Sequence, residues 1–441
     1  MATFYIDTGG NASNSGTSDN NSPDFSGSAA SVAGSVVTLD GSPDLSGVST
    51  SGPTQAAIHI TDATNSNQKI FKITTVDNVL KTVTVSVAPT GVTSSAWRIG
   101  GRHVLTRASI EGTTGPGDTV IFNNSPAAAA AVIWTFRTAG DSVTGPVTIK
   151  GKTGVRPVFN TTDTNNCVAS AVAYSRIENI EIDQDGATGH GINTTGSNCV
   201  CLNIKVSDAG GNGVTTTGAG SVVIGCEISG CGADGINYNG SQGTFIGNYI
   251  HDVTGDGIEL SGTTPRGQIL NNIIDTCAAR GIYLSGSVST GGLPSVIYGN
   301  TVYGCGNSGL EITDADNYVV LLNNIFQDNG NAAGEYNVEW VAGSHEASGS
   351  LHYNNIFYHQ GGGGGANLLG LTVNSTEAIT DPLFTDPSNG DFTLQTLSPA
   401  RATGYPGIFV GGSTSYLDIG AVQRLEPATF LRNPGMNGGL V

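Results

Sequence analysis

The chain has 441 residues, of which 65 are glycine and only 12% are charged, and its formal net charge is −18 at pH 7. Such an acidic surface would repel phosphates and argues against a nucleic-acid partner. Abundant glycine with few charges favours turns and strands over long helices. We expect no secretion signal and no membrane insertion, because the start lacks a basic and apolar stretch and no apolar run could span a bilayer.

Residues 1–100 are predicted to form an N-terminal region of their own. Residues 1–54 are rich in Gly, Ser, Asn, Asp and Thr around one strand-like stretch, TFYID, which indicates a loop-rich segment. From residue 56 to 99 apolar and polar residues alternate, with a turn at Asp77-Asn78. This alternation predicts a small antiparallel β module.

Residues 101–420 are predicted to form a solenoid. The residues at 105, 108 and 110 have helical spacing and predict a short helix that caps the first coil, and PGDTVIF at 116–122 is the first predicted strand. Further on, a glycine followed by an aliphatic residue returns at intervals of 22, 22, 22, 24 and 28 residues. The pairs are Gly191-Ile192, Gly213-Val214, Gly235-Ile236, Gly257-Ile258, Gly281-Ile282 and Gly309-Leu310. A period in the low twenties is the signature of stacked strand-and-turn coils.

Equivalent residues of such coils stack in columns about 4.8 Å apart. Treated as one strand, the stretch from Phe245 to Ile250 should point Ile246, Asn248 and Ile250 to one side and Phe245, Gly247 and Tyr249 to the other. The repeat also predicts an inward asparagine ladder, in which each buried amide bonds the copies above and below. Its members are Asn248, Asn272, Asn300, Asn324 and Asn355.

The seven cysteines are predicted to be buried thiols rather than disulfides or metal ligands. Cys231, Cys277 and Cys305 lie four residues before the repeat glycine, in a column of small apolar groups. Cys199 and Cys201 are expected to point to opposite faces, unlike a zinc-binding pair with two residues between its members. No zinc site is predicted.

The glycine-isoleucine steps, the asparagine column and the stretch GNYIHDVTGDGIEL at 247–260 resemble the right-handed parallel β-helix proteins of the pectate-lyase-like superfamily. The resemblance covers about residues 115–420. It implies an all-β, right-handed parallel β-helix with a small N-terminal β module, a closing segment before residue 420 and an extended C-terminal arm at 421–441. The fold hosts lyases, hydrolases, epimerases, phage tailspikes and structural proteins, so it does not fix the function.

One face of the predicted solenoid carries the best indication of function. The extra residues of the later coils follow the glycine-isoleucine strands, where they would build a wall beside that face. Carboxylates, an amide and a tyrosine suit sugar hydroxyls and sugar rings. The glycan-binding candidates are Asn237, Glu259, Tyr283 and Glu311.

The same face offers four interpretations. The catalytic candidates are Asp234, Asp256, Glu259, Arg280 and Glu311. Paired carboxylates suit glycoside hydrolysis. In a lyase, Asp234 and Asp256 would instead hold Ca²⁺ while Arg280 removes a proton beside an acidic sugar carboxylate. In the third interpretation the face is a solvated polar ladder with an exposed Asp256–Arg280 ion pair worth about 0–1 kcal/mol. A purely structural Ca²⁺ at Asp234 and Asp256 is the remaining alternative, and no other cofactor is expected.

Two histidines are assigned no catalytic role. His251 and Asp252 are consecutive on a strand and are expected to diverge rather than form a dyad. His190 has the repeat phase of Asn212 and Asp234 and is expected to be a surface polar residue.

Two classes of function remain. The favoured one is a structural or adhesive virion protein of a bacteriophage, such as a fibre, tailspike or capsid decoration, assembled in the host cytoplasm and contacting cell-surface polysaccharide. Its partners would be other virion proteins or further copies of itself, for example in a trimer. The alternative is an extracellular polysaccharide lyase or glycoside hydrolase that acts through the acidic face.

Overall fold

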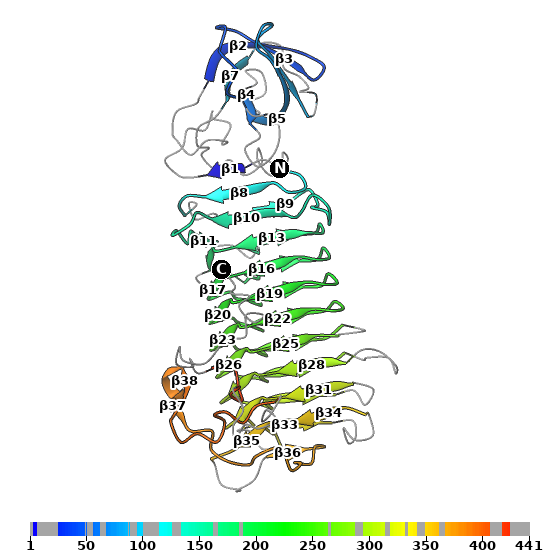
Figure 1. Cartoon of the computed structure of the whole chain (residues 1–441), viewed down its shortest axis with the longest axis vertical. Helices are drawn as coiled ribbons and strands as arrows, with labels where there is room; N and C mark the ends of the chain where they lie inside the picture. Colours follow the sequence, from blue (N-terminus) through cyan, green and yellow to red (C-terminus); the bar gives the residue numbers. More distant parts are fainter. Residues whose placement is uncertain are drawn as a thin grey trace, which may run out of the picture.

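The computed structural model describes residues 3–6, 25–48, 50, 56–61, 68–86, 88, 95–99, 114–125, 134–161, 166–184, 188–262, 266–286, 294–313, 318–330, 334–341, 349–360, 367–405 and 417–423. A long β-helix makes up most of this part of the chain, and a small barrel lies at one end (Figure 1). The chain has the predicted all-β fold. Within the described ranges, no helix is both long and apolar enough to cross a bilayer.

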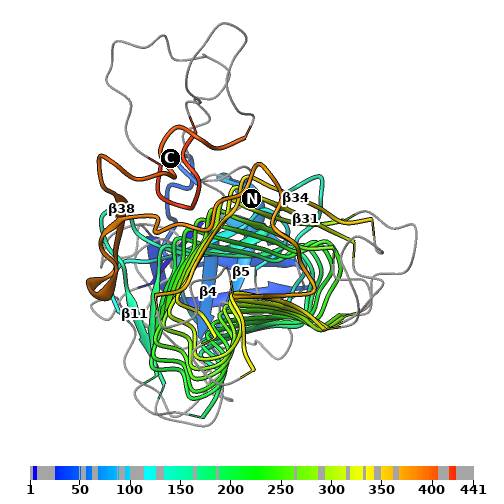
Figure 2. The same cartoon turned by 90° about the horizontal axis from the view of Figure 1, so that it is seen from below.

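Three parallel sheets form the sides of the β-helix, and a full coil adds one strand to each (Figure 2). Among the described residues, sheet 1 contains β1 Thr3–Ile6, β8 Thr119–Phe122, β10 Val147–Gly151, β13 Ser175–Glu178, β16 Val200–Leu202, β19 Val222–Ile224, β22 Thr244–Ile246, β25 Gln268–Leu270, β28 Ser295–Tyr298, β31 Val319–Leu322 and β34 Leu351–Tyr353. Sheet 2 contains β11 Val158–Asn160, β14 Glu181–Asp183, β17 Lys205–Ser207, β20 Glu227–Ser229, β23 Tyr249–His251, β26 Ile273–Asp275, β29 Thr301–Tyr303, β32 Ile325–Gln327 and β35 Ile356–Tyr358. Sheet 3 contains β9 Trp134–Phe136, β12 Val168–Ser170, β15 Ile192–Thr194, β18 Val214–Thr216, β21 Ile236–Tyr238, β24 Ile258–Leu260, β27 Ile282–Leu284, β30 Leu310–Ile312, β33 Val338–Trp340 and β36 Leu368–Leu369.

The repeat glycine has a steric reason. It stands directly before β15, β18, β21, β24, β27 and β30 of sheet 3, where neighbouring coils come close. At Gly235, an added Cβ would lie 2.4 Å from Ile250 Cγ2 and 2.7 Å from the Gly257 carbonyl oxygen. The following aliphatic residue points inward, and the predicted buried column is confirmed: Ile192, Val214, Ile236, Ile258 and Ile282 are all 0% exposed.

The predicted asparagine ladder is also confirmed. The Nδ2 of Asn248 donates to Asn272 Oδ1 at 2.9 Å, and the Nδ2 of Asn272 donates to Asn300 Oδ1 at 3.0 Å. The same bond continues through Asn324 to Asn355. Each side-chain oxygen also accepts the backbone N–H of the preceding coil, so these buried amides are satisfied.

The predicted alternation along residues 245–250 is wrong in part, because this stretch is two strands and not one. Gly247, with a φ of 62°, forms the corner between β22 and β23. A corner resets the alternation, so Phe245 points inward and is 0% exposed while Ile246 points outward. Asn248 and Ile250 are buried as predicted.

The N-terminal region contains more regular structure than the sequence indicated. Its six strands close into an antiparallel barrel in the order β2-β3-β6-β5-β4-β7. They are β2 Phe25–Ala33, β3 Val36–Leu39, β4 Ala57–Thr61, β5 Gln68–Asp77, β6 Thr82–Val85 and β7 Ser95–Ile99. The segment 1–54, predicted to be loop-rich, therefore holds β2, β3 and β1, and β1 pairs in parallel with β8 at the end of sheet 1. Lys72 of the barrel forms an ion pair with the buried Asp118 of the first coil.

The C-terminal closing segment covers part of sheet 2. Its hairpin consists of β37 Phe384–Asp386, the 3₁₀ turn η2 Pro387–Asn389 and β38 Asp391–Leu394. Phe384 and Phe392 pack with Ile325 and Ile356 of sheet 2. The predicted helix around residues 105–110 and most of the predicted arm at 421–441 lie outside the described residues.

Candidate functional site

The candidate residues lie together on the outer face of sheet 3. In the three-residue strands of sheet 3, such as β21, β24 and β27, the first and last residues point inward and the middle residue points outward. The strand register stacks these middle residues in one column. In chain order, the column reads Thr215, Asn237, Glu259, Tyr283, Glu311 and Glu339. The structure thus brings all four predicted glycan-binding residues together.

A second column runs beside the first, one residue before each repeat glycine. Here the side chain of one coil accepts the backbone N–H of the next. Asp234 N donates to Asn212 Oδ1 at 3.0 Å, Asp256 N to Asp234 Oδ1 at 2.9 Å, and Arg280 N to Asp256 Oδ1 at 2.9 Å. His190 belongs to the same series, because its Nδ1 accepts the N–H of Asn212 at 2.9 Å. This half-buried ring is therefore a structural link rather than a freely solvated group, and its burial lowers its pKa.

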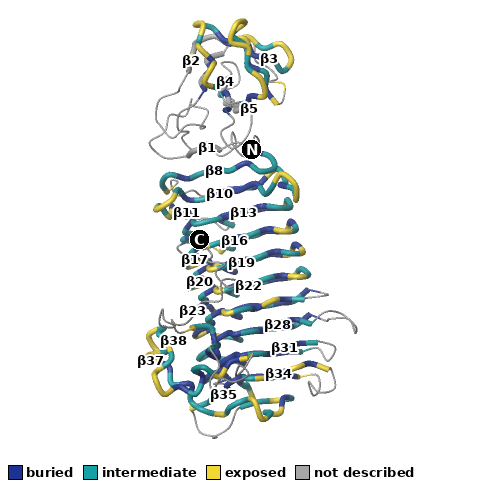
Figure 3. The backbone as a smooth tube through the Cα atoms, viewed as in Figure 1, coloured by how far each residue is buried: buried dark blue, intermediate teal, exposed yellow. Residues whose placement is uncertain are grey.

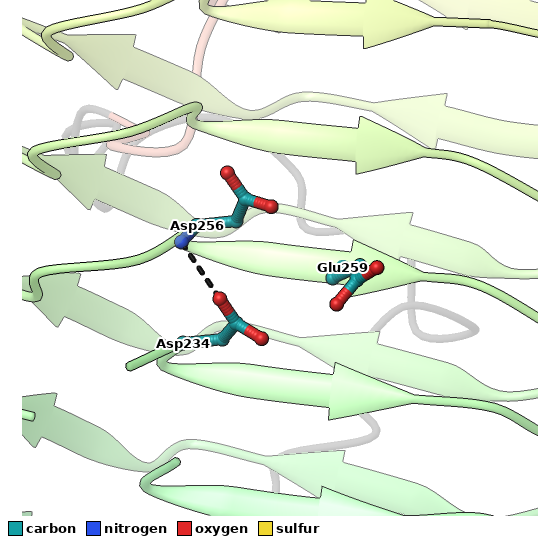
Figure 4. A group of neighbouring side chains, drawn as sticks. All are labelled: Asp234, Asp256 and Glu259. Atoms are coloured by element: carbon teal, nitrogen blue, oxygen red, sulfur yellow. Dashed lines mark hydrogen bonds between the residues drawn. The ribbon is translucent and has the colours of Figure 1, made fainter. Parts of the chain in front are cut away.

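Asp234, Asp256 and Glu259 form an acidic triad (Figure 4). One carboxylate oxygen of each lies within 4.8 Å of the others. Asn237 Nδ2 donates to Asp234 Oδ2 at 2.8 Å and also to Glu259 Oε2. Burial, followed by the charges of Asp234 and Asp256, raises the pKa of Glu259 to about 7. Burial also raises the pKa of Asp256, so Asp256 and Glu259 hold protons more tightly than free carboxyl groups do.

Arg280 is bound to its neighbours on three sides. Its Nε donates to Glu311, its Nη1 lies 3.4 Å from Asp256 Oδ1, and its guanidinium lies 3.9 Å from the centre of the Tyr283 ring. The Asp256 side chain is only 8% exposed, so the predicted exposed ion pair is in fact largely buried. An arginine held in this way is poorly placed to remove a proton from a substrate.

A second acidic group continues the face, and of its members the sequence analysis had named only Glu311. Glu311, Glu335 and Glu339 bring carboxylate oxygens within 4.8 Å of one another. Ser308 Oγ donates to Glu339 Oε2 at 2.6 Å and to Glu335 Oε2 at 3.1 Å. Burial raises the pKa of Glu339. The glycine-aliphatic repeat does not reveal β33, because Asn337 stands in place of the repeat glycine before this strand. The spacing of Glu339 from Glu311 was the available signal.

The prediction that His251 and Asp252 diverge is wrong. His251 Nδ1 lies 2.8 Å from Asp252 Oδ2. β23 ends at His251, and Asp252 adopts a left-handed conformation with φ of 54°, which turns its side chain back toward the ring. The ring also stacks on Tyr249, with the centroids 4.4 Å apart. This pair lies on sheet 2, away from the acidic triad on sheet 3.

All seven cysteines are free and buried, as predicted. The placement of Cys199 and Cys201 on opposite faces is wrong, because residues two apart in a strand share a face, and both side chains are buried. Burial raises the pKa of both thiols, which disfavours metal-binding thiolates. The groups of the described chain suited to a metal are the two carboxylate clusters, whose oxygen donors fit a hard cation such as Ca²⁺.

Comparison with known proteins agrees with the fold. A family model described as a right-handed β-helix region matches residues 163–291. No curated protein sequence matches the chain significantly. Among solved structures, pectate lyase Pel9A matches with 14% identity and a TM-score of 0.50, over 73% of this chain and 92% of that one.

Two further structures match less well. An alginate lyase from Paenibacillus sp. str. FPU-7 has 14% identity and a TM-score of 0.45, over 58% of this chain and 93% of that one. The Dettilon tailspike protein has 13% identity and a TM-score of 0.38, over 62% and 63% of the two chains. At these identities the likeness is one of fold and does not transfer a site.

Proposed function

We propose that this chain, a right-handed parallel β-helix protein, is a structural or adhesive virion protein of a bacteriophage that contacts surface glycans through sheet 3. The observation that supports glycan binding is the preorganised polar face. Asn237, Glu259 and Tyr283 stand in one column on rigid strands, and hydrogen bonds or stacking fix each of them in place. Fixed amides, carboxyl groups and an aromatic ring suit the hydroxyls and rings of a sugar.

The layout of the molecule supports a role in attachment. The six-stranded barrel lies at one end of the β-helix, while sheet 3 faces sideways (Figure 1). A protein anchored by such an end would present the glycan-binding face outward. A fibre, a tailspike and a capsid decoration all match this layout, with the barrel contacting other virion proteins.

Two measurements test this proposal. The first is binding of the full chain to neutral and acidic polysaccharides, in which Asn237→Ala should weaken binding at least tenfold. Asn193→Ala is the matched control, because Asn193 occupies the same column two coils earlier, and it should bind like the wild type. The second is the presence of the protein in purified phage particles. A chain that binds no polysaccharide and is missing from particles would overturn the proposal.

A second candidate, glycoside hydrolysis, is favoured by the pKa of Glu259. A carboxyl group that titrates at about 7 beside two other carboxylates is a suitable general acid. Glu259 would give its proton to the glycosidic oxygen as the bond to the leaving sugar breaks. Asp234 would attack the anomeric carbon through Oδ2, since its Oδ1 accepts the N–H of Asp256. Water would then release the sugar. Oxygens within 4.8 Å fit the short separation of a retaining enzyme better than the wide one of an inverting enzyme.

This candidate has its own test. New reducing ends should form from a polysaccharide, and Glu259→Gln should lower the rate by at least a hundredfold while binding persists. Unsaturated products, abolished by chelators, would point instead to a lyase with Ca²⁺ at Asp234 and Asp256. Most of the wall predicted beside this face, at residues 261–267, 285–295 and 342–349, lies outside the described residues. We expect binding without turnover. Arg280, the base of a lyase, is engaged by Glu311 and Asp256, and Asp234 Oδ2, the nucleophile of a hydrolase, is engaged by Asn237.

A further inference from the structure

The outer face of sheet 1 is unusually apolar for a solvent-facing side of a β-helix. From β16 to β34 the strands place one set of residues inward and the alternate set outward. The last residues of β16 to β31 all point outward and stack in register: Leu202, Ile224, Ile246, Leu270, Tyr298 and Leu322. The other outward residues of β16–β34 are Val, Leu or Tyr, except for Thr244 and Gln268. These outward residues of β16–β34 are called the apolar strip below.

The strip is partly exposed along its whole length. Its members on β16 to β31 have intermediate or greater exposure, and Leu351 and Tyr353 of β34 are each 43% exposed (Figure 3). At the β34 end, Leu322, Leu351 and Tyr353 line a hollow of about 350 Å³ together with Tyr405. Contiguous apolar surface of this kind on a soluble protein marks an interaction site.

The outer faces of sheets 2 and 3 do not expose a comparable row of apolar side chains in the described chain. Sheet 2 also has outward isoleucines, but Ile325 and Ile356 are covered by the C-terminal hairpin and are 0% exposed. The outward column of sheet 3 is polar or acidic from Asn193 to Glu339 except for Tyr283. Within the described chain, the apolar strip is therefore the long apolar face that has no cover of its own.

We propose that the apolar strip is the interface of a homodimer, in which the strip of one copy packs against the strip of a second copy. Charge favours this face, because a chain with a net charge of −18 repels its copies most weakly through a surface without charges. From β16 to β34 the outward positions carry no charge, whereas Arg176 and Glu178 on β13 mark the end of the strip.

The spacing of the strip favours a second copy over an unrelated partner. Its side-chain rows repeat with the distance between strands, about 4.8 Å. An identical β-helix has the same pitch, so rows of one copy can lie between rows of the other along the whole contact. One self-complementary patch generates a two-fold pair, whereas a trimer would need two different patches.

The size of the strip sets the expected strength. Seven strands span about 30 Å and two outward residues span about 10 Å, so the apolar centre is roughly 300 Å², against about 800 Å² per partner in a standard interface. The uncharged corners next to the strip, such as Asn203 and Gly225, have to complete the contact. We therefore expect a dimer that dissociates on dilution. Sheet 3 remains free in this pair, so the inference does not depend on the proposed function.

Light scattering during size-exclusion chromatography tests the proposal on the full chain over a concentration series. At the upper end the wild type should reach twice the 44.7 kDa of one chain. The double variant Ile246→Glu/Leu270→Glu should stay at the mass of one chain at every concentration. Asn193→Glu/Thr215→Glu adds the same charge to half-exposed positions on sheet 3 and should dimerise like the wild type. A wild type that is monomeric throughout, or a strip variant that still dimerises, overturns the proposal.

Disulfide trapping provides a test that does not depend on charged variants folding. The seven native thiols are buried, so a cysteine introduced on the surface is the reactive one. Single cysteines at Leu202, Ile224, Ile246, Leu270 and Leu322 should include at least one, near the two-fold axis, that gives a crosslinked dimer under mild oxidation. Thr215→Cys on sheet 3 should give none. Failure of every strip position to crosslink contradicts the proposed interface.

Discussion

The buried asparagine ladder and the acidic ladder beside sheet 3 use the same hydrogen bond in opposite directions. In the asparagine ladder, the backbone N–H of one coil donates to the side chain of the following coil, as from Asn248 N to Asn272 Oδ1. In the acidic ladder, it donates to the side chain of the preceding coil, as from Asp256 N to Asp234 Oδ1. Both ladders join coils that are otherwise linked by short strands.

The two ladders differ in what the second polar atom of each side chain, Nδ2 of asparagine or Oδ2 of aspartate, contacts. In the asparagine ladder Nδ2 is used as well: Asn272 Nδ2 donates to the Phe245 carbonyl at 3.0 Å and to Asn300 Oδ1. In the acidic ladder, Oδ2 of Asp234 accepts from Asn237 of its own coil. Because asparagine would supply the same Oδ1, the ladder does not require the negative charges of Asp234 and Asp256. The charge of Asp256 is paired with Arg280, whereas that of Asp234 is available for a ligand.

The largest expected effect comes from exchanging the chemistry of the buried ladder. Asn272→Asp would replace a donor by an oxygen facing the Phe245 carbonyl and Asn300 Oδ1, and would bury a charge. We expect a loss of roughly 3–5 kcal/mol in the free energy of unfolding. Urea unfolding measures it, with Asn193→Asp as the half-exposed control. A loss no greater than that of the control would show that the ladder tolerates charge.

A smaller effect is expected from the titration of Glu259. The pKa of Glu259 rises from the 4.5 of a free glutamate to about 7 in the folded chain. Between these two pH values the folded state therefore binds the Glu259 proton more tightly than the unfolded state does. The contribution of Glu259 to the free energy of unfolding should therefore be largest below pH 4.5 and fall as the pH rises to about 7. After allowance for solvent screening the fall should be about 1 kcal/mol. Urea unfolding across this pH range should show a shallower slope for Glu259→Gln, and an identical slope would contradict the assignment.

The smallest effect is expected from Asp256→Asn. The new amide keeps the Oδ1 that accepts the N–H of Arg280, and it loses the ion pair to Arg280 Nη1 at 3.4 Å. It also removes a buried carboxylate whose ionisation burial already disfavours. These changes oppose one another, so the free energy of unfolding should change by less than about 1 kcal/mol. Asp256→Ala, which has no acceptor, should be clearly less stable; equal stability of the two variants would mean that the ladder bond contributes little.

The sequence was sufficient for features that repeat. The glycine-isoleucine period predicted the buried column through Ile236, and the asparagine column predicted the ladder, because each coil repeats the same local environment. The acidic face followed from the same phase, since residues one period apart must stack. The apolar strip follows from triplets such as VVI and QIL only when the alternation starts again at each corner between strands.

The features that escaped prediction depend on contacts between different elements. Besides the predicted Asp256, Arg280 pairs with Glu311, one coil further along the chain, and only the side-chain geometry selects Glu311 over Glu259. The barrel closes through pairing of β2 with β7, across about seventy residues whose local pattern indicates only strands. The His251–Asp252 contact depends on one left-handed residue at a strand end, which alternation alone cannot anticipate.

The pairing of β1 with β8 has a consequence for how the molecule is made. Thr3 lies beside Thr119, and the whole barrel sequence is inserted between these two strands. During synthesis β1 emerges first but has no partner until β8 and the coil behind it exist, while the barrel strands can already pair among themselves. The N-terminal edge of sheet 1 therefore remains open until a contact of very long sequence separation forms, and closing so long a loop is slow. Once formed, this contact joins the barrel sequence to the β-helix at both of its ends, and β1 covers the edge of β8 that would otherwise stay unpaired.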